Sequence, residues 1–471
     1  MLLKRFYDAG LAQASYLLGC QAAGEAIVVD PNRDIEQYVR AAAEEGVKIT
    51  RVTETHIHAD FVSGSRELAA RTGAELLLSD EGGDDWSYRF GGADGVRLLK
   101  DGDTIRVGKV RLDVHHTPGH TPEHLSFIVT DSAATDRPMG VLTGDFIFVG
   151  DVGRPDLLER AAKVAGTMDA SARALYHSIQ RFKQLQDYLQ LWPGHGAGSA
   201  CGKALGAVPS TTLGYERLSN WALNTPNEEA FVAAVLAGQP EPPRYFAHMK
   251  KVNRDGPKVL GGIARVPKLE DAQLESVLHN GRLVVDTRSA VAFASGHVPG
   301  TINVPLNRSF TTYAGSLLPY DQDFLLIADA GLDEAVRALR MIGLERVSGR
   351  FGASAVDAWR ESGKALGVTQ QLSPADLDKL VREGAVHVVD VRDASEWEEG
   401  HLPRVGNLPL NQLPDRMAEL PRDIPIAVHC KTGSRAAIAA SLMRANGVPN
   451  VSILAGGFDG WKAEGRPVET T

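Results

Sequence analysis

Short apolar runs alternate with amphipathic segments through the first half of the chain. Residues 14–19 and 25–30 predict two strands separated by a glycine turn. Residues 34–45 have the spacing of an amphipathic helix, and 140–145 predict a later strand that ends in an aspartate. This interleaving of strands and helices favours an α/β fold, which we place at residues 1–240.

The second half of the chain contains an internal repeat. Residues 284–306 match residues 388–410 at a constant offset of 104. A period of this length indicates two similar domains rather than a solenoid. We expect small parallel-sheet α/β domains at 263–365 and 366–471, after a Pro- and Gly-containing linker at 241–262. The expected structural ion pairs at the strand ends are Asp286–Arg288 and Asp390–Arg392.

The composition of the 471-residue chain narrows the classes of function. A net charge of −9 without a basic run argues against nucleic acid as a main partner. No apolar stretch approaches the ~18 residues of a membrane span, and the first residues lack the apolar core of a secretory signal. The three cysteines, Cys20, Cys201 and Cys430, lie far apart, which fits a reducing compartment. We therefore expect a cytoplasmic protein without a membrane partner.

Ligand-type side chains gather where predicted strands end. The apolar run 47–52 leads into Thr53–Gly64, which carries two histidines and an aspartate at alternating positions, and three later junctions repeat the arrangement beside Gly or Pro. These residues are His56, His58, Asp60, His120, Asp145 and His195. Four junctions of this kind in one α/β region predict a metal site on loops at one end of the scaffold. Imidazole and carboxylate together suit Zn, Fe, Mn or Ni.

The two copies of the repeat differ in one loop. In the second copy the predicted strand 424–429 leads into Cys430-Lys431-Thr-Gly433-Ser-Arg435, and a helix follows. The loop amides, the helix N-terminus and Arg435 should favour the thiolate of Cys430. In the first copy the matching strand, 324–328, leads into residues 329–334, which contain neither cysteine nor arginine. Only the second copy can use a sulfur nucleophile.

The first half resembles the metallo-β-lactamase superfamily. The motifs His-x-His-x-Asp, Thr-Pro-Gly-His-Thr, Thr-Gly-Asp and Pro-Gly-His-Gly occur in the family's order, and the resemblance implies an αββα sandwich. Dinuclear members such as glyoxalase II carry a further histidine directly after the aspartate of the first motif. Phe61 stands there in this chain, so a second metal at that position would be poorly held.

The persulfide dioxygenase branch of that superfamily is the better match. It keeps one Fe(II) on two histidines and one carboxylate, and the resemblance implies His56, His120 and Asp145 as the ligands. His58, Asp60 and His195 would then orient the ligands or contact metal-bound water.

Two further residues are candidates for contacts with the substrate or its sulfur. The segment 150–156 resembles a loop in which an arginine binds the carboxylate of the thiol substrate, which makes Arg154 a substrate-binding candidate. The alternative for Arg154 is a structural ion pair with Asp151 or Asp156. Cys201 follows His195 in a glycine-containing loop, and it is either a buried structural thiol or a sulfur relay near the iron.

The C-terminal third, residues 366–471, resembles rhodanese, with Cys-x-x-Gly-x-Arg and a closing Gly-Gly-Phe-Asp-Gly-Trp motif. The resemblance implies that Cys430 carries a sulfane sulfur, within a catalytic loop that includes Lys431, Gly433 and Arg435. Residues 265–365 resemble a rhodanese that has lost its cysteine. The order of the three parts resembles bacterial persulfide dioxygenase–rhodanese fusions.

The function implied by the resemblance is sulfide oxidation. A thiol persulfide, based on glutathione, coenzyme A or a similar thiol, would react with O₂ at Fe(II) to give sulfite, and Cys430 would then form thiosulfate. A dimer or tetramer is expected. Two alternatives stay open: a zinc thioester hydrolase of the glyoxalase II type, and a sulfur carrier or persulfide sensor that uses Cys430 without O₂ uptake.

Overall fold

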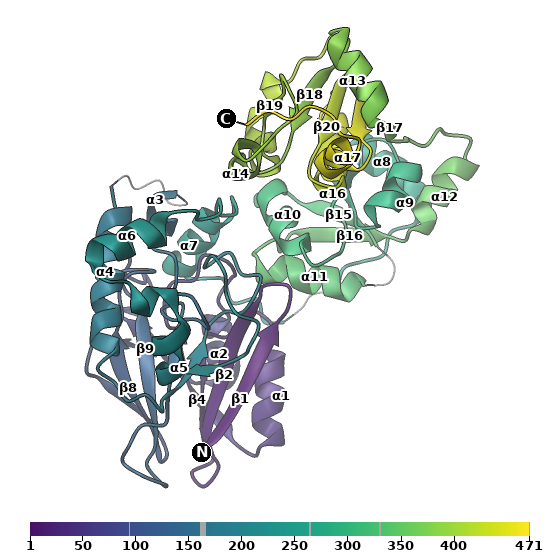
Figure 1. Cartoon of the computed structure of the whole chain (residues 1–471). Coiled ribbons are helices and arrows are strands. Elements are labelled where there is room, and N and C mark those ends of the chain that lie inside the picture. Colours follow the sequence, from purple (N-terminus) through teal and green to yellow (C-terminus); the bar gives the residue numbers. More distant parts are fainter. Residues whose placement is uncertain (94, 161–165, 263–264, 329–330, 471) are drawn as a thin grey trace. The chain divides into compact units, whose positions relative to one another are not determined.

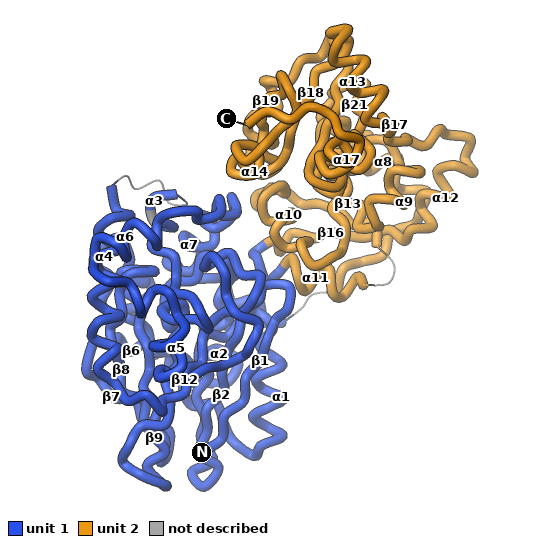
Figure 2. The backbone as a smooth tube through the Cα atoms, in the orientation of Figure 1, with its two compact units in different colours: residues 1–263, 340–343 blue, residues 264–339, 344–471 orange. Residues whose placement is uncertain are grey.

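The chain divides into two compact units. The computed structural model describes residues 1–93, 95–160, 166–262, 265–328 and 331–470. Unit 1 comprises residues 1–263 and 340–343, and unit 2 comprises residues 264–339 and 344–471 (Figure 2). Figure 1 labels many of their helices and strands.

Unit 1 is built on two six-stranded sheets. The strands of the first, in spatial order, are β1 (Leu2–Asp8), β2 (Gln13–Cys20), β3 (Glu25–Val29), β4 (Lys48–Thr53), β5 (Glu75–Ser79) and β6 (Val96–Leu99). Those of the second are β12 (Thr211–Thr212), β11 (Gln190–Pro193), β10 (Gly140–Gly144), β9 (Leu125–Asp131), β8 (Val110–His116) and β7 (Thr104–Val107).

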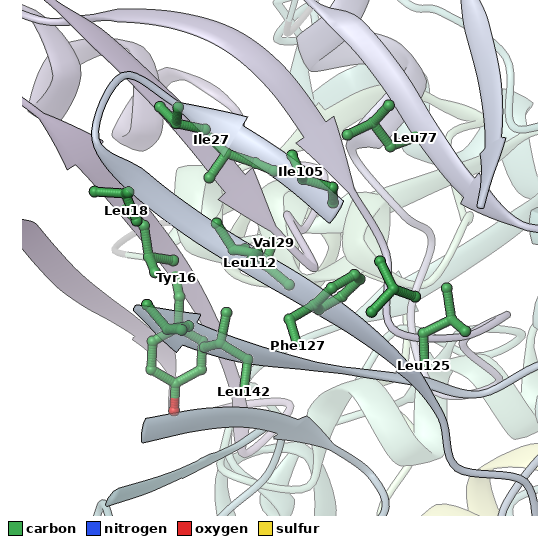
Figure 3. Close-up of a cluster of buried hydrophobic side chains, with 14 of the residues drawn as sticks. Tyr16, Leu18, Ile27, Val29, Leu77, Ile105, Leu112, Leu125, Phe127 and Leu142 are labelled. Atoms are coloured by element: carbon green, nitrogen blue, oxygen red, sulfur yellow. The ribbon is translucent and has the colours of Figure 1, made fainter. Parts of the chain in front are cut away.

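The alternation of side chains along the strands explains why the two sheets pack together. In β2, Tyr16 and Leu18 join a buried cluster shared by both sheets, whereas Leu17 faces the opposite side. From the second sheet, Leu112 and Phe127 reach the same cluster (Figure 3). This apolar layer between the sheets is the core of unit 1.

Helices cover the outer face of each sheet. On the first sheet, Tyr38 and Leu68 lie in a cluster with strand residues such as Val52. On the second, Leu175 and Phe231 pack in the same way. The helices of this region are α1 (Glu36–Glu44), α2 (Ser65–Thr72), α3 (Leu157–Arg160), α4 (Met168–Phe182), α5 (Leu213–Ser219), α6 (Glu228–Leu236) and α7 (Phe246–Asp255). The expected αββα sandwich is confirmed.

Unit 2 contains two separate parallel sheets, as the repeat predicts. The first has the order β14 (Ile302–Asn303), β13 (Leu283–Asp286), β15 (Phe324–Ile327) and β16 (Val347–Phe351). The second has the order β17 (Gln370–Leu372), β21 (Val451–Leu454), β20 (Ile426–His429), β18 (His387–Asp390) and β19 (Gly406–Asn407).

The helices between residues 274 and 463 alternate with these strands. They are α8 (Leu274–His279), α9 (Ala290–Ser295), α10 (Phe310–Leu317), α11 (Leu332–Met341), α12 (Ser354–Glu361), α13 (Pro374–Arg382), α14 (Ala394–Glu398), α15 (Leu413–Arg416), α16 (Ser434–Ala445) and α17 (Gly457–Ala463). The expected ion pairs form in both copies, with Arg288 on Asp286 and Arg392 on Asp390 at 2.6 Å. Of the loop that replaces the cysteine loop in the first copy, Asp329 and Ala330 lie outside the described residues.

Residues 241–262, the expected linker, contain helix α7 and belong to unit 1. Buried Phe246 and Met249 anchor the helix. Within the described ranges, no helix combines the length and the apolar character needed to cross a membrane.

Candidate metal centre and cysteine loop

Three expected ligands converge at one end of the sandwich in unit 1. His56 follows β4, His120 lies between β8 and β9, and Asp145 directly follows β10. Asp145 Oδ2 lies 3.9 Å from His56 Nε2 and 3.5 Å from His120 Nε2. All three side chains are buried, and their ligand atoms lie within 4.8 Å of one another. That spacing suits one shared cation.

The protein fixes the tautomer of both histidines. The Thr55 hydroxyl donates to Asp30 at 2.9 Å, so its oxygen is left to accept from His56 Nδ1–H, also at 2.9 Å. His120 Nδ1–H donates to the carbonyl oxygen of Arg154 at 3.0 Å. In each ring the lone pair is therefore on Nε2, the atom nearest Asp145. Burial lowers the pKa of both histidines, that of His56 well below its ordinary value, which keeps the rings neutral.

One carboxylate oxygen of Asp145 is available to a metal ion, and the other accepts a hydrogen bond from His195. Its Oδ1 accepts from His195 Nδ1 at 2.7 Å, and His195 Nε2 donates to Asp60 at 2.8 Å. Burial opposes charge on His195, but the two carboxylates outweigh it and raise its pKa well above the ordinary value. Asp145 Oδ2 is buried and has no hydrogen-bond partner within the described ranges. Two neutral imidazoles and an unpaired carboxylate oxygen fit a divalent cation.

The Nε2 atom of His58 faces Asp30. Its Nε2 lies 3.1 Å from Asp30 Oδ1, which also accepts from the backbone N–H of Thr55 at 2.6 Å. Burial opposes its charge, but the charge of Asp30 and the hydrogen bond to it raise the pKa of His58 to about 9. Asp30 thus links His58 to the hydroxyl that orients His56. In the sequence, the only sign of this role for Asp30 is its position at the end of the predicted strand 25–30.

Two other residues support the metal loop and were not foreseen. Asn253, in α7, donates to the carbonyl oxygens of His58 and Phe61, each at 2.7 Å. Glu123 accepts from the backbone N–H of Ile57 at 2.7 Å. Neither residue belongs to a recognisable motif, and both act through the backbone of the loop.

Arg154 forms the ion pair with Asp156 that the sequence offers as the alternative to substrate binding. Its guanidinium is fully buried and makes two hydrogen bonds to Asp156, at 2.8 and 2.7 Å. It also donates to the carbonyl oxygens of Ala200 and Pro240. Because these contacts engage the guanidinium with protein groups, a substrate-binding role for Arg154 stays a prediction.

Cys201 lies beside the metal centre. It is buried, and burial together with the charges of Asp145 and Asp60 raises the pKa of its thiol well above the ordinary value. It groups with Asp60 and His195, with ligand atoms within 4.8 Å of one another. The structure thus places the thiol near the candidate metal ligands, and its role as a relay stays a prediction.

The cysteine loop of unit 2 lies between β20 and α16. Cys430 is 1% exposed, and its sulfur accepts from the backbone N–H of Gly433 at 3.1 Å. At Gly433 the φ of +117° suits glycine, and Lys431 is exposed. The carbonyl oxygen of Cys430 accepts from Phe458 N at 2.7 Å. A Cβ at Gly457 would lie 2.5 Å from that same oxygen, which explains the closing Gly-Gly-Phe motif.

The Arg435 side chain is already engaged by carboxylates. Its guanidinium pairs with Glu396 of α14, at 2.5 and 2.9 Å. Asp393 lies 3.6 Å away. These carboxylates therefore partly offset the electrostatic stabilisation that Arg435 is expected to give an anion on Cys430.

Comparison with known families agrees with this geometry. The family model of the metallo-beta-lactamase superfamily matches residues 9–195, and that of the rhodanese-like domain matches residues 270–349 and 373–464. The solved structure of a metallo-beta-lactamase from Staphylococcus aureus subsp. aureus COL is 43% identical. It covers 75% of this chain and 99% of its own, with a TM-score of 0.68.

Curated relatives of the first half have two different activities. The mitochondrial persulfide dioxygenase ETHE1 of Homo sapiens is 27% identical over 198 residues, which are 41% of this chain and 68% of that protein. A hydroxyacylglutathione hydrolase of a Polaromonas species is 32% identical over 183 residues, which are 38% of this chain and 61% of that protein. The chain belongs to the metallo-β-lactamase superfamily and joins a domain homologous to persulfide dioxygenase ETHE1 to rhodanese-like domains.

Proposed function

We propose that this protein oxidises a low-molecular-weight thiol persulfide with O₂ and then transfers sulfane sulfur through Cys430. The observation that carries the proposal is the donor set of His56, His120 and Asp145, next to Phe61 rather than a further histidine. Two imidazoles and one carboxylate are the usual protein ligands of non-haem Fe(II) oxygenases.

The reaction balances without a further reductant. One persulfide RSSH, one O₂ and one water give one thiol RSH, one sulfite and two protons. A bound Fe(II) would supply open positions for O₂ and the sulfane sulfur and would mediate the electron transfer between them. His56, His120 and Asp145 would hold it.

The surrounding residues keep the donor set in place. Asp30 and Thr55 orient His56, the carbonyl oxygen of Arg154 orients His120, and His195 orients Asp145. The buried position of these groups limits access of water.

The second reaction uses the cysteine loop. The Cys430 thiolate attacks the sulfane sulfur of RSSH, so that a Cys430 persulfide forms and RSH leaves. Sulfite then takes the outer sulfur, which gives thiosulfate and restores the thiolate. The amide of Gly433, 3.1 Å from the sulfur, would stabilise the anionic forms.

A second candidate is a zinc-dependent thioester hydrolase with a sulfurtransfer domain. The similarity to a hydroxyacylglutathione hydrolase favours it. Such a hydrolase would use a metal-bound hydroxide and, in its dinuclear form, a second ion. Phe61 beside Asp60 counts against the histidine-bound form of that second site.

Product analysis separates the two candidates. Iron-loaded protein is given glutathione or coenzyme A persulfide in air, and sulfite and thiosulfate are measured for wild type and Cys430→Ser. We expect thiosulfate from wild type and sulfite from the variant. Thioester cleavage by the zinc-loaded protein, with neither product from persulfide, would overturn the proposal in favour of the hydrolase.

A further inference from the structure

A cavity of about 550 Å³ adjoins the cysteine loop of unit 2. Thr432, Gly433 and Ser434 of this loop line it, and Gly433 is the residue whose backbone N–H donates to the Cys430 sulfur at 3.1 Å. Gly456 also lines it, directly before the Gly-Phe pair that contacts the carbonyl oxygen of Cys430. Sites for small molecules commonly have volumes of about 300–1,000 Å³. The cavity therefore has the size and the place to hold the body of a substrate whose sulfur reaches Cys430.

The copy without the cysteine provides part of the wall. Helix α9 of that copy lines the cavity with Val291, Ala294 and Ser295. The helix packs against α16, which begins at the end of the cysteine loop. A hydrogen bond of 2.9 Å, from the backbone N–H of Asn303 to the hydroxyl of Ser441 in α16, joins the same two copies. These contacts hold α9 beside the cysteine loop, so the first copy completes the cavity of the second.

The lining of the cavity is uncharged. Among the described residues, no charged side chain lines it. The polar side chains that line it are hydroxyls and one carboxamide, on Ser295, Thr369, Gln371, Thr432 and Ser434. A charged group that enters such a cavity loses water without gaining a counter-charge, which is costly. Amides and hydroxyls of a ligand, in contrast, find groups that donate and accept hydrogen bonds.

We propose that this cavity binds the thiol part of the persulfide that donates sulfur to Cys430, and that it selects a thiol without charge near its sulfur. The pantetheine end of coenzyme A has this chemistry, because it carries amides, a hydroxyl and methyl groups but no charge. Glutathione carries two carboxylates and an ammonium group. The inference rests on the proposed sulfurtransfer through Cys430 and names the class of its donor.

The transfer needs no oxidant or reductant. The Cys430 thiolate bonds to the sulfane sulfur of RSSH, the S–S bond of RSSH breaks, and RSH leaves with the proton of the persulfide. Sulfite then takes the outer sulfur from Cys430. In sum, RSSH and sulfite give RSH and thiosulfate. The group R occupies the cavity only in the first of these two steps.

A comparison of a large and a small sulfur donor tests the cavity. Without O₂, the full-length protein makes thiosulfate from sulfite and pantetheine persulfide. In a second assay it makes thiocyanate from cyanide and thiosulfate, a donor without a thiol arm. Ala294→Trp fills the cavity, so kcat/KM for pantetheine persulfide relative to that for thiosulfate should fall by about tenfold. Ala292→Trp, at an exposed position of α9 outside the cavity, should leave this ratio unchanged. Both rates come from one preparation, so a loss of folded protein cancels from the ratio.

A second variant adds charge without filling the cavity. Val291 is 78% exposed, so Val291→Arg disturbs no core. Wild type should use pantetheine persulfide with a kcat/KM about tenfold above that for glutathione persulfide. Val291→Arg should reduce this preference by a factor of about 2–5, because the guanidinium attracts the carboxylates of glutathione.

The outcomes separate this inference from the proposed function. Equal use of both persulfides by wild type would overturn the inference and leave the sulfurtransfer in place. The same donor ratio in Ala294→Trp and Ala292→Trp, or an unchanged preference in Val291→Arg, would do so too. No thiosulfate from wild type with either persulfide would refute the proposed sulfurtransfer itself, and this inference with it.

Discussion

The side-chain amide of Asn253 donates to the carbonyl oxygen of His58 at 2.7 Å, which ties α7 to the loop that carries His56. The same amide donates to Phe61, and its oxygen accepts from the backbone N–H of Ser63 at 2.9 Å. Three backbone groups of the metal loop therefore depend on one buried side chain from the segment that the sequence suggested to be a linker.

Asn253→Ala should destabilise unit 1 and weaken metal binding. The change leaves two carbonyl oxygens and one N–H buried without partners, at a cost of about 2–4 kcal/mol. Thermal unfolding and metal content would measure both effects. Lys251→Ala, at an exposed position of the same helix, is the matched control and should leave both unchanged. Equal behaviour of the two variants would refute this role for α7.

Glu123 should make unit 1 less stable as the pH rises. Burial raises its pKa from the ordinary 4.5 to about 7, against the opposing effect of the Ile57 N–H. A carboxyl whose pKa is raised in the folded state contributes its full stability below about pH 4.5 and loses it as the pH rises through about 7. Lys250, whose pKa burial lowers to about 8, stays mainly charged across that window.

Glu123→Gln isolates this effect, because glutamine can still accept from Ile57. The variant should have about the wild-type melting temperature at about pH 5 and a higher one at about pH 8. The measurement is thermal unfolding of the metal-free protein across this range. Glu44→Gln, on the exposed end of α1, should show no such trend. A constant difference between Glu123→Gln and wild type at all pH values would contradict the prediction.

Arg154 should contribute to the stability of unit 1 rather than to substrate binding. Removing one partner of a buried ion pair leaves an uncompensated charge, so Arg154→Ala should cost about 3–5 kcal/mol. Asp156→Asn should cost a comparable amount, whereas Arg173→Ala, which breaks a surface pair with Asp169, should cost little. The measurement is chemical unfolding beside the KM for persulfide. A stable Arg154→Ala protein with a raised KM would restore the substrate-binding hypothesis.

Glu396 should restrain the reactivity of Cys430. Its carboxylate neutralises Arg435, and this pairing lowers the pKa of Glu396 despite its burial. Glu396→Gln removes the nearer of the two carboxylates that pair with the guanidinium, so alkylation of Cys430 at neutral pH should accelerate by a factor of roughly 3–10. Glu399→Gln, an exposed position nearby in the chain, is the control. An unchanged or slower rate in Glu396→Gln would show that the ion pair does not affect the cysteine.

The fold followed closely from local patterns. Strands and helices of unit 1 lie where hydrophobic periodicity places them, for example the strand Gln13–Cys20, predicted at 14–19, and the helix Glu36–Glu44, predicted at 34–45. The repeat predicted two parallel sheets because each copy carries its own strands and strand-end ion pair. These features depend on neighbours in the chain, which a single sequence reveals.

The supports of the candidate site could not be predicted in the same way. Asp30 and Asn253 reach the metal loop from positions far away in the sequence, and no motif marks them. Arg154 was ambiguous because a motif does not reveal whether a nearby carboxylate is a partner, and only the fold brings Asp156 onto its guanidinium. The pairing of Arg435 with Glu396 likewise depends on the packing of α14 against the cysteine loop.

The most direct test of the central claim is O₂ consumption by the anaerobically purified, iron-loaded protein on addition of fresh glutathione or coenzyme A persulfide. In Cys430→Ser, which cannot consume persulfide by sulfurtransfer, we predict one O₂ taken up for each persulfide lost. Wild type should also take up O₂, and His120→Ala, which loses one of the three ligands, should take up none. No uptake by wild type with either persulfide, despite bound iron, would contradict the assignment of a persulfide dioxygenase.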